Sequence, residues 1–335
     1  MKALLSHRPG PPESLVLEDV AEAAPGAGEI SIRVIACGAN FPDLLMVADR
    51  YQFRPPRPFA PGAEVAGIVE AVGPGVAGFA PGDRVMAICS WGGMAEKLVV
   101  SETKCVPVPD FMPMDEAAAF QLTYGTAHYA LVSCGKLAAG QTLLVLGAAG
   151  GVGLAAVELG KALGASVVAA VSSPEKSEVA RGCGADATIV YPRGPLDRDA
   201  RRALAADFRQ ATRGGPHLIL DPVGGDYSEA ALRAIRRRGR LVVVGFAGGI
   251  PSIPLNLVLL NDARIVAGAW GAVVAEDPAR FRSTIADLVD LYARGLLRPR
   301  ISERLPLKEG ARALSLLEER SAIGKIVIEI GREAT

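Results

Sequence analysis

Residues 147–153, with the sequence Gly-Ala-Ala-Gly-Gly-Val-Gly, have the types and spacing to bind a phosphate group. They directly follow the apolar run 143–146 and directly open a stretch with helical periodicity. Glycines at such a turn let the backbone bend tightly and approach a pyrophosphate, which then lies at the free N–H groups of the helix N-terminus. Ala148 stands at the first glycine of the usual Gly-x-Gly-x-x-Gly pattern, so the strand-loop-helix context favours a dinucleotide site over a purely structural turn. The predicted contacts are Gly147, Ala149, Gly150, Gly151, Val152 and Gly153.

Polar residues after the next strand indicate which dinucleotide is bound. That strand ends in Ser172 and Ser173, where an NAD-preferring site usually has an acidic residue for the ribose 2′-hydroxyl. A carboxylate would repel a 2′-phosphate, whereas hydroxyl groups can donate to it. Lys176 follows within one helical turn, and Tyr191 and Arg193 lie just past the following strand, so all can reach one corner of a doubly wound sheet. The pattern favours NADPH, with ordinary solvated charges as the alternative interpretation of Lys176 and Arg193.

The elements that must position these residues are predicted from apolar runs that alternate with helical stretches. Continuous apolar runs are typical of parallel strands buried on both faces. Repeated strand-helix units of this kind predict a doubly wound parallel sheet. Gly245 and Phe246 follow the last run and join the predicted cofactor contacts. The predicted strands are 143–146, 167–171, 187–190, 218–220 and 241–244, and the first is followed by a helix that ends at Gly164.

The first third of the chain has a different pattern, in which short predicted strands are separated by Gly and Pro. Frequent turn signals between short strands predict a small barrel-like β domain. Near the C-terminus, a helical stripe is followed by one final strand. The predicted strands are 30–34, 65–72, 84–88, 96–100 and 326–330, and the stripe consists of Phe281, Ile285, Leu288 and Tyr292.

Bulk composition excludes several classes of function. The 335 residues carry 36 Lys and Arg against 36 Asp and Glu, which gives no electrostatic case for nucleic-acid or membrane-surface binding. The basic run 236–240 is interpreted as a cationic helix end closed by Gly239. No signal peptide or apolar membrane span is visible. Five cysteines without paired spacing indicate a reducing compartment, so we expect a soluble, cytoplasmic protein.

Six stretches are spread in order over nearly the whole chain, namely Gly38–Asp43, Pro61–Gly67, Pro81–Val85, Gly147–Gly153, Asp221–Gly225 and Gly324–Val327. Together they resemble the zinc-independent quinone oxidoreductase group of the medium-chain dehydrogenases/reductases. The resemblance implies an α/β protein with a GroES-like β-barrel domain over 1–123 and 271–335 and a Rossmann domain over 124–270. It also implies a cleft between the domains for nicotinamide and substrate.

The resemblance also bears on zinc. Alcohol dehydrogenase relatives hold catalytic zinc with a Cys in the segment that matches Asn40 and a His in the one that matches Ala63, and neither ligand type is present here. The four-cysteine structural zinc lobe is missing too. Without a Lewis acid, alcohol–ketone interconversion is disfavoured, whereas hydride addition to a quinone or an α,β-unsaturated carbonyl needs no metal. We therefore expect no metal site.

A polar group must still stabilise the oxyanion that develops on the acceptor. The resemblance implies that Asn40, Asp43 and Tyr51 line the cleft and that Thr126 lies near the nicotinamide. Tyr51 is the preferred catalytic residue, because a phenol can donate a hydrogen bond and a proton. Alternatively, Tyr51 packs on nearby prolines, and Asn40 and Asp43 only stabilise their loop.

Three functions stay open on these grounds: an NADPH:quinone or enone reductase, an enoyl thioester reductase acting on acyl-CoA, and a non-catalytic NADPH-binding protein like the crystallins of this family. The quinone or conjugated carbonyl reductase is preferred, with a small molecule as its partner. The segment Arg264–Ala269 resembles the edge strand through which this family forms homodimers, and pairing would cover that strand.

Overall fold

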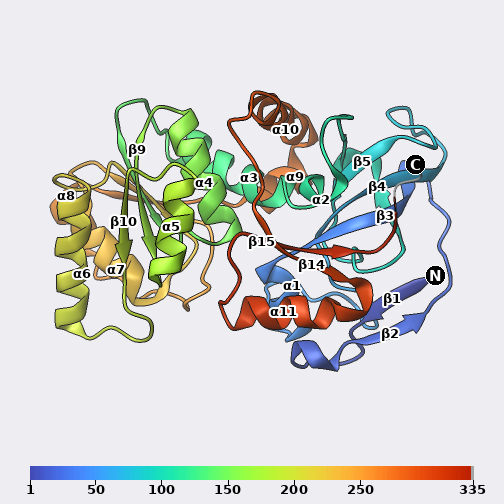
Figure 1. Cartoon of the computed structure of the whole chain (residues 1–335), viewed down its shortest axis with the longest axis horizontal. Helices are drawn as coiled ribbons and strands as arrows, with labels where there is room; N and C mark the ends of the chain where they lie inside the picture. The colour runs from blue at the N-terminus through green and yellow to red at the C-terminus, as the bar shows by residue number, and fades with distance from the viewer. Residues whose placement is uncertain (333–335) are drawn as a thin grey trace. The chain divides into compact units, whose positions relative to one another are not determined.

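The computed structural model describes residues 1–332. It divides into two compact units (Figure 1). The first unit comprises Met1–Leu122, Val273–Ile285 and the chain from Pro299 onward, and the second comprises Thr123–Ala272 and Ala286–Arg298. The main divisions thus fall after Leu122 and Ala272, where the sequence predicts 123 and 270, and the stretch 286–298 goes with the second unit.

The second unit is built on a parallel sheet, as predicted. Within residues 1–332 this sheet has six strands in the order β10-β9-β8-β11-β12-β13. The order reverses between β8 and β11, which makes the sheet doubly wound. Its strands are β8 (Thr142–Leu146), β9 (Ser166–Val171), β10 (Ala187–Val190), β11 (Leu218–Asp221), β12 (Arg240–Val243) and β13 (Arg264–Ala267). The helical segments of this part are α3 (Gln121–His128), η3 (Tyr129–Cys134), α4 (Gly151–Ala162), α5 (Pro174–Gly182), α6 (Arg198–Ala211), α7 (Gly225–Ala234) and α8 (Asn256–Asn261).

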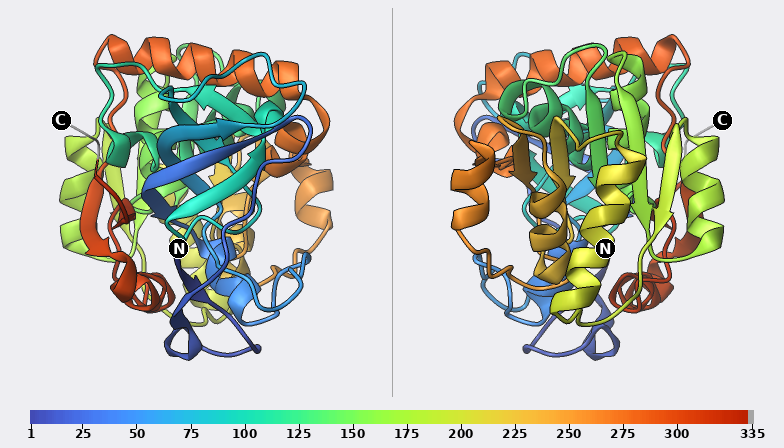
Figure 2. Two further views of the ribbon diagram at one scale, coloured as in Figure 1. Left: turned by 90° about the vertical axis from the view of Figure 1, so that its right-hand side faces the viewer. Right: turned by 90° about the vertical axis from the view of Figure 1, so that its left-hand side faces the viewer.

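Helices cover both faces of this sheet (Figure 2, right). Leu144 and Val168 belong to an apolar core with side chains of α6 and α7, including Phe208. On the other face, a Cβ added to Gly160 of α4 would lie 2.8 Å from the side chains of Leu143 and Val167. Since neighbouring strand residues point to opposite faces, α4 packs opposite α6 and α7. Burial on both faces explains why these strands are continuous apolar runs.

The first unit is built on a mostly antiparallel sheet. In the described part of the chain its order is β14-β15-β3-β4-β5-β7, and β6 also pairs with β3. The C-terminal strand β15 pairs antiparallel with the far end of β3, and β14 pairs parallel with β15. Its strands are β3 (Glu29–Ala39), β4 (Glu64–Val72), β5 (Arg84–Ile88), β6 (Lys97–Ser101), β7 (Cys105–Pro107), β14 (Ile301–Pro306) and β15 (Lys325–Glu329). Two further strands, β1 (Lys2–Leu5) and β2 (Val16–Asp19), form a separate antiparallel pair. The helical segments are η1 (Pro12–Ser14), α1 (Phe41–Val47), η2 (Glu102–Lys104), α2 (Met114–Ala117), η4 (Leu307–Glu309) and α11 (Gly310–Glu318), and α9 (Trp270–Glu276) and α10 (Pro278–Ala293) connect the units along the chain.

The interpretation of the basic run 236–240 is wrong. Helix α7 ends at Ala234, and Ile235 has extended backbone angles. The left-handed residue of the following turn is Arg238, with φ of 63°, and not Gly239. The helix ends early because Arg236 N–H donates to the Pro216 carbonyl, which directs the chain into β12.

In residues 1–332, no helix is both long and apolar enough to cross a membrane.

Candidate functional site

The glycine loop 147–150 connects β8 to α4 as predicted, with Gly150 as the N-cap of the helix. Gly147 has a φ of 59°, which favours glycine. A Cβ on Gly153 would lie 2.3 Å from the Gly147 carbonyl oxygen, so only glycine permits this close approach of loop and helix. The first N–H groups of α4 have no partner within the helix. The loop therefore has the shape and the donors that a pyrophosphate requires.

The predicted phosphate-reading residues follow β9 and β10, which are neighbouring strands. Val171 pairs with Val190, so Ser172 and Tyr191 follow at adjacent positions, and Tyr191 N–H donates to Val171 O at 2.9 Å. Ser173 caps α5 by accepting from Lys176 N–H at 3.3 Å. Ser172 and Lys176 are half-buried. The sheet thus brings these hydroxyl groups and the first turn of α5 to the same edge as the glycine loop.

Of the predicted cofactor contacts, Tyr191 is buried and Arg193 is exposed. The Tyr191 ring is buried against Tyr227, with ring centroids 4.7 Å apart, so it belongs largely to the core. Arg193 is exposed in a turn whose flanking carbonyls, those of Pro192 and Gly194, accept from the Tyr227 hydroxyl at 2.9 and 3.3 Å. This turn holds Arg193 at the solvent side of the same edge.

The turn 221–225 supports the glycine loop from β11, a role that sequence reasoning missed. The fully buried Asp221 accepts from the N–H groups of Val223 and Gly224 at 2.9 and 2.8 Å, and also from the Ser228 hydroxyl. Val223 lies against the loop, because a Cβ on Gly147 would be 2.8 Å from its Cγ2. Gly245 follows β12 beside Pro222, and Phe246 is exposed.

In the first unit, Asn40 and Asp43 stand at the start of α1. Asn40 N–H donates to Asp43 Oδ2 at 2.8 Å, and Gly62 N–H donates to Asp43 Oδ1 at 3.1 Å. Burial raises the pKa of Asp43 to about 7, against the opposing effects of these two N–H groups and of Lys325. Asp43 thus ties the start of α1 to the segment that precedes β4.

Lys325 and Glu64 complete a buried polar network around Asn40. Their side chains are 5% and 1% exposed. The Lys325 ammonium donates to Asn40 Oδ1 at 2.7 Å, to the Ala39 carbonyl at 3.1 Å and to Glu64 Oε1. Glu64 also accepts from Asn40 Nδ2 at 3.1 Å and from Leu122 N–H at 2.9 Å.

In this network the side chains of Asn40 and Asp43 hold neighbouring segments together. These contacts support the alternative interpretation, in which both residues stabilise their loop. In the sequence, Lys325 and Glu64 stand out only as members of stretches with a family resemblance. The signal that could have revealed them is a charged residue at the head of an otherwise apolar strand in each case, Glu64 before 65–69 and Lys325 before 326–328.

Tyr51 lies on the loop 48–58 after α1 and is half-buried. Burial raises its pKa, and the nearby Asp43 carboxyl group raises it further, while a hydrogen bond with Gln52 opposes the change. The phenol therefore keeps its proton at neutral pH and can act as a donor. Thr126, the residue predicted near the nicotinamide, lies on α3 in the second unit and is half-buried.

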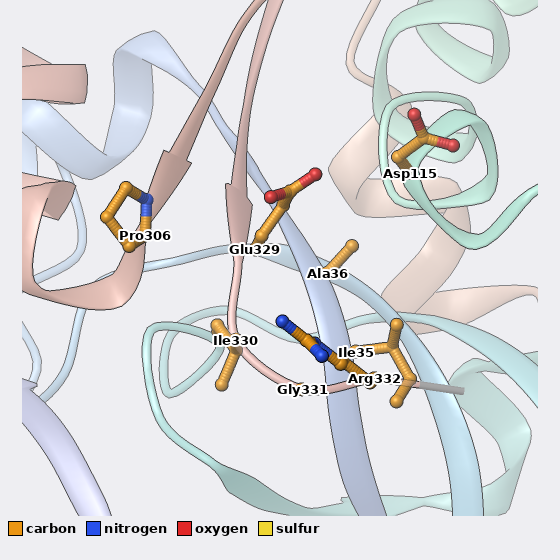
Figure 3. A pocket seen from close by; sticks show the side chains of 8 residues that line it. All are labelled: Ile35, Ala36, Asp115, Pro306, Glu329, Ile330, Gly331 and Arg332. Carbon is orange, nitrogen blue, oxygen red and sulfur yellow. The ribbon is translucent and has the colours of Figure 1, made fainter. Parts of the chain in front are cut away.

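A hollow of about 590 Å³ lies elsewhere in the first unit, at the end of β15 (Figure 3). Among the residues that line the hollow, Asp115 forms an ion pair with Arg304 at 2.6 Å. The lining contains none of the predicted site residues and consists of Ile35, Ala36, Asp115, Pro306, Glu329, Ile330, Gly331 and Arg332. This hollow is therefore separate from the candidate site.

Metal ligands do not gather in the part of the chain that the structure describes, where no three His, Cys, Asp or Glu side chains form a cluster suited to a metal ion. Asn40, at a position that resembles a zinc-ligand position, is hydrogen-bonded to Lys325. Zinc independence stays a prediction, based on the residue types at Asn40 and Ala63.

Comparisons with known proteins agree with this architecture. Residues 26–110 match the alcohol dehydrogenase GroES-like domain, and residues 151–292 match the zinc-binding dehydrogenase family. The chain is 37% identical over 327 residues to a quinone oxidoreductase of Pseudomonas aeruginosa, covering 95% of this chain and 96% of the relative. It is 34% identical over 318 residues to quinone oxidoreductase-like protein 2 of Bos taurus, covering 94% and 89%.

Solved structures give the same result. The quinone oxidoreductase of Escherichia coli complexed with NADPH matches with a TM-score of 0.90 at 28% identity, covering 98% of this chain and all of that one (100%). A mycobacterial protein complexed with NADPH matches with a TM-score of 0.91 at 30% identity, covering 98% and 99%.

The fold is thus that of the medium-chain dehydrogenases/reductases, with a GroES-like domain and a Rossmann-like parallel sheet, which confirms the predicted fold class. Within this superfamily the chain belongs to the quinone oxidoreductase family of oxidoreductases.

Proposed function

We propose that this protein is an NADPH-dependent, zinc-independent reductase that transfers hydride to a quinone or an α,β-unsaturated carbonyl compound. The observation that carries the proposal is the polar end of β9, where Ser172 and Ser173 stand beside the glycine loop in place of an acidic residue. Two structural neighbours are complexed with NADPH, and the relative from Pseudomonas aeruginosa is a quinone oxidoreductase.

The residues of the second unit supply binding and orientation. The N–H groups at the start of α4 hold the pyrophosphate, while Ser172, Lys176 and Arg193 hold the 2′-phosphate. The turn 221–225 keeps the glycine loop in shape through Val223. When bound, NADPH supplies the hydride from its nicotinamide ring.

In the first unit, Tyr51 is proposed to stabilise the reduced acceptor. Its hydroxyl donates a hydrogen bond to the acceptor oxygen that becomes negative, and then supplies a proton directly or through water. Its raised pKa keeps the phenol protonated over the neutral range, so the hydroxyl is available as a hydrogen-bond donor. Asn40 and Asp43 contribute by fixing the helix that leads into the Tyr51 loop.

The test is steady-state turnover of a naphthoquinone, an open-chain enone and crotonyl-CoA with NADPH and with NADH. We expect NADPH-dependent reduction of the quinone or the enone in preference to the thioester. Tyr51→Phe should lower turnover of the enone by about 10²–10³, with an intact affinity for NADPH. Quinones take their proton from water more easily, so their loss should be about tenfold or less. Preferred turnover of crotonyl-CoA would point instead to an enoyl thioester reductase, and tight NADPH binding without any turnover to a non-catalytic protein.

We also propose that the protein forms a homodimer through β13. This strand lies at one end of the parallel sheet, and in residues 1–332 it pairs only with β12. Four large apolar residues just before it are between 74% and 84% exposed, namely Ile250, Leu255, Leu259 and Leu260. An apolar edge of this kind is an aggregation hazard unless a second copy covers it.

Light scattering at micromolar concentration should return the mass of a dimer. Leu259→Glu together with Leu260→Glu should shift it to a monomer, because two carboxylates would then be buried in the interface. Val190→Glu, on an exposed apolar residue of the opposite edge strand β10, is the matched control and should stay dimeric. A monomeric wild-type protein would contradict the proposal.

A further inference from the structure

Two aromatic rings of the first unit stack in a position where solvent reaches them. The rings of Phe53 and Trp91 have centroids 5.2 Å apart and planes inclined by 28°. Phe53 is nevertheless 43% exposed, and Trp91 is only half-buried. Stacking on Trp91 thus covers only part of the Phe53 side chain. The rest of this apolar side chain stays in contact with water, and covering it with another ring would be favourable.

The loop that carries Phe53 is closed at its base by Arg57. Its guanidinium donates to Asp49 Oδ1 at 2.6 Å and to the Val47 carbonyl at 3.1 Å, and it lies 5.0 Å from the ring centroid of Phe59. The two ends of this loop are therefore joined to each other and to the end of α1. The same loop also carries Tyr51.

The turn that carries Trp91 is fixed to the segment that follows this loop. Gly92 N–H donates to Ala60 O at 2.7 Å, and Gly93 N–H donates to Gly62 O at 3.0 Å. Gly62 N–H in turn donates to Asp43. A Cβ on Gly93 would lie 2.9 Å from the Gly62 oxygen, so the close contact between these segments requires glycine there. Both rings thus stand on one hydrogen-bonded framework, and their stacking is preorganised.

We propose that Phe53 and Trp91 form a stacking platform for the planar ring of the acceptor, so that fused-ring quinones are favoured over open-chain enones. This inference rests on the proposed function and names its substrate class more closely. A planar acceptor stacks on the available face of Phe53 and brings its oxygen to the part of the molecule that holds Tyr51, two residues earlier on the same loop. Offset stacking between rings accounts for about a 2- to 10-fold preference.

The experiment compares kcat/KM for 1,4-naphthoquinone with that for but-3-en-2-one at saturating NADPH. In Phe53→Leu and in Trp91→Leu we expect the ratio of the two values to fall about 2- to 10-fold, mainly through the KM for the quinone. Phe53→Tyr retains an aromatic ring and should retain the ratio. This variant keeps the test valid if Phe53→Leu does not fold. Phe111→Leu is the matched control, because Phe111 is another exposed phenylalanine of the first unit, at 58%, and it should leave the ratio unchanged.

Binding is measured separately, without NADPH, by the quenching of tryptophan fluorescence by 1,4-naphthoquinone. Phe53→Leu retains both tryptophans of the chain and should lose the saturable part of the quenching, whereas Phe111→Leu should retain it. An unchanged substrate ratio in both leucine variants, or an equal loss for quinone and enone, would overturn the platform. Absence of turnover with every acceptor would instead overturn the proposed function, while saturable quenching that depends on Phe53 would still support the platform as a ring-binding site.

Discussion

Replacing Lys325 with methionine should destabilise the first unit by about 3 kcal/mol, at the lower end of the 3–5 kcal/mol typical of a broken buried ion pair. The change leaves the buried Glu64 without its cationic partner. The cost is at the lower end because Glu64 keeps two donors, Asn40 Nδ2 at 3.1 Å and Leu122 N–H at 2.9 Å. A surface pair is the matched control: Arg304→Met breaks its bond with Asp115, and since Arg304 is 46% exposed, we expect a loss below about 1 kcal/mol.

The assay is urea unfolding followed by the fluorescence of Trp91, with every variant made in a Trp270→Phe background so that the signal reports the first unit. A double-mutant cycle with Glu64→Gln isolates the interaction. If Lys325 and Glu64 stabilise each other, the double variant should lose less than the sum of the single variants, by about 2 kcal/mol or more. Additive losses, or a loss in Lys325→Met no larger than in Arg304→Met, would refute the reasoning.

Further predictions concern the cofactor, the metal and pH. Lys176→Ala should weaken NADPH binding by about 1.5–3 kcal/mol and barely change NADH binding in fluorescence titrations, and an equal loss for both cofactors would show that Lys176 does not read the phosphate. Elemental analysis should find no stoichiometric zinc, and near one zinc per chain with activity lost to chelators would contradict this. Because burial raises the pKa of Asp43 to about 7 in the folded protein, its contribution to stability is greatest in acid and is lost as pH rises through about 7. Asp43→Asn should flatten that dependence in urea unfolding measured from about pH 5 to about pH 8.

Much of the second unit could be predicted from the sequence, because its information is local. Each parallel strand is buried on both faces and is therefore a continuous apolar run, and β10 was predicted with its observed bounds, 187–190. The glycine loop was predicted from residues that are neighbours in the chain. Strand β3 runs on to Ala39, beyond the predicted 30–34, because register shifts let its far end pair with both β4 and β15.

The first unit was harder to predict, because its important contacts join distant residues. Lys325 and Glu64 are 261 positions apart, and no periodicity relates them. Phe53 and Trp91 meet only because the chain returns after Ala60 and hydrogen bonds bring Gly92 to that residue. The end of α7 was misplaced for a similar reason, since a hydrogen bond from Arg236 to the distant Pro216 ends the helix before Gly239.

The first-unit stretches that carry the family resemblance prove to be largely scaffold. Asn40 and Asp43 from one stretch, Glu64 from a second and Lys325 from a third meet in one buried network that joins α1, β4 and β15. Residues held in this way can vary little without leaving a buried charge unpaired. The loop 48–58 and the turn around Trp91 are different, because they carry partly exposed side chains, Phe53 and Trp91. The loop is closed by Arg57, and the turn is held by Gly62, which also donates to Asp43. If the two segments bind the acceptor as proposed, changes on them alter which acceptor is bound while the framework stays the same. We therefore expect differences in substrate preference between relatives to depend on these segments.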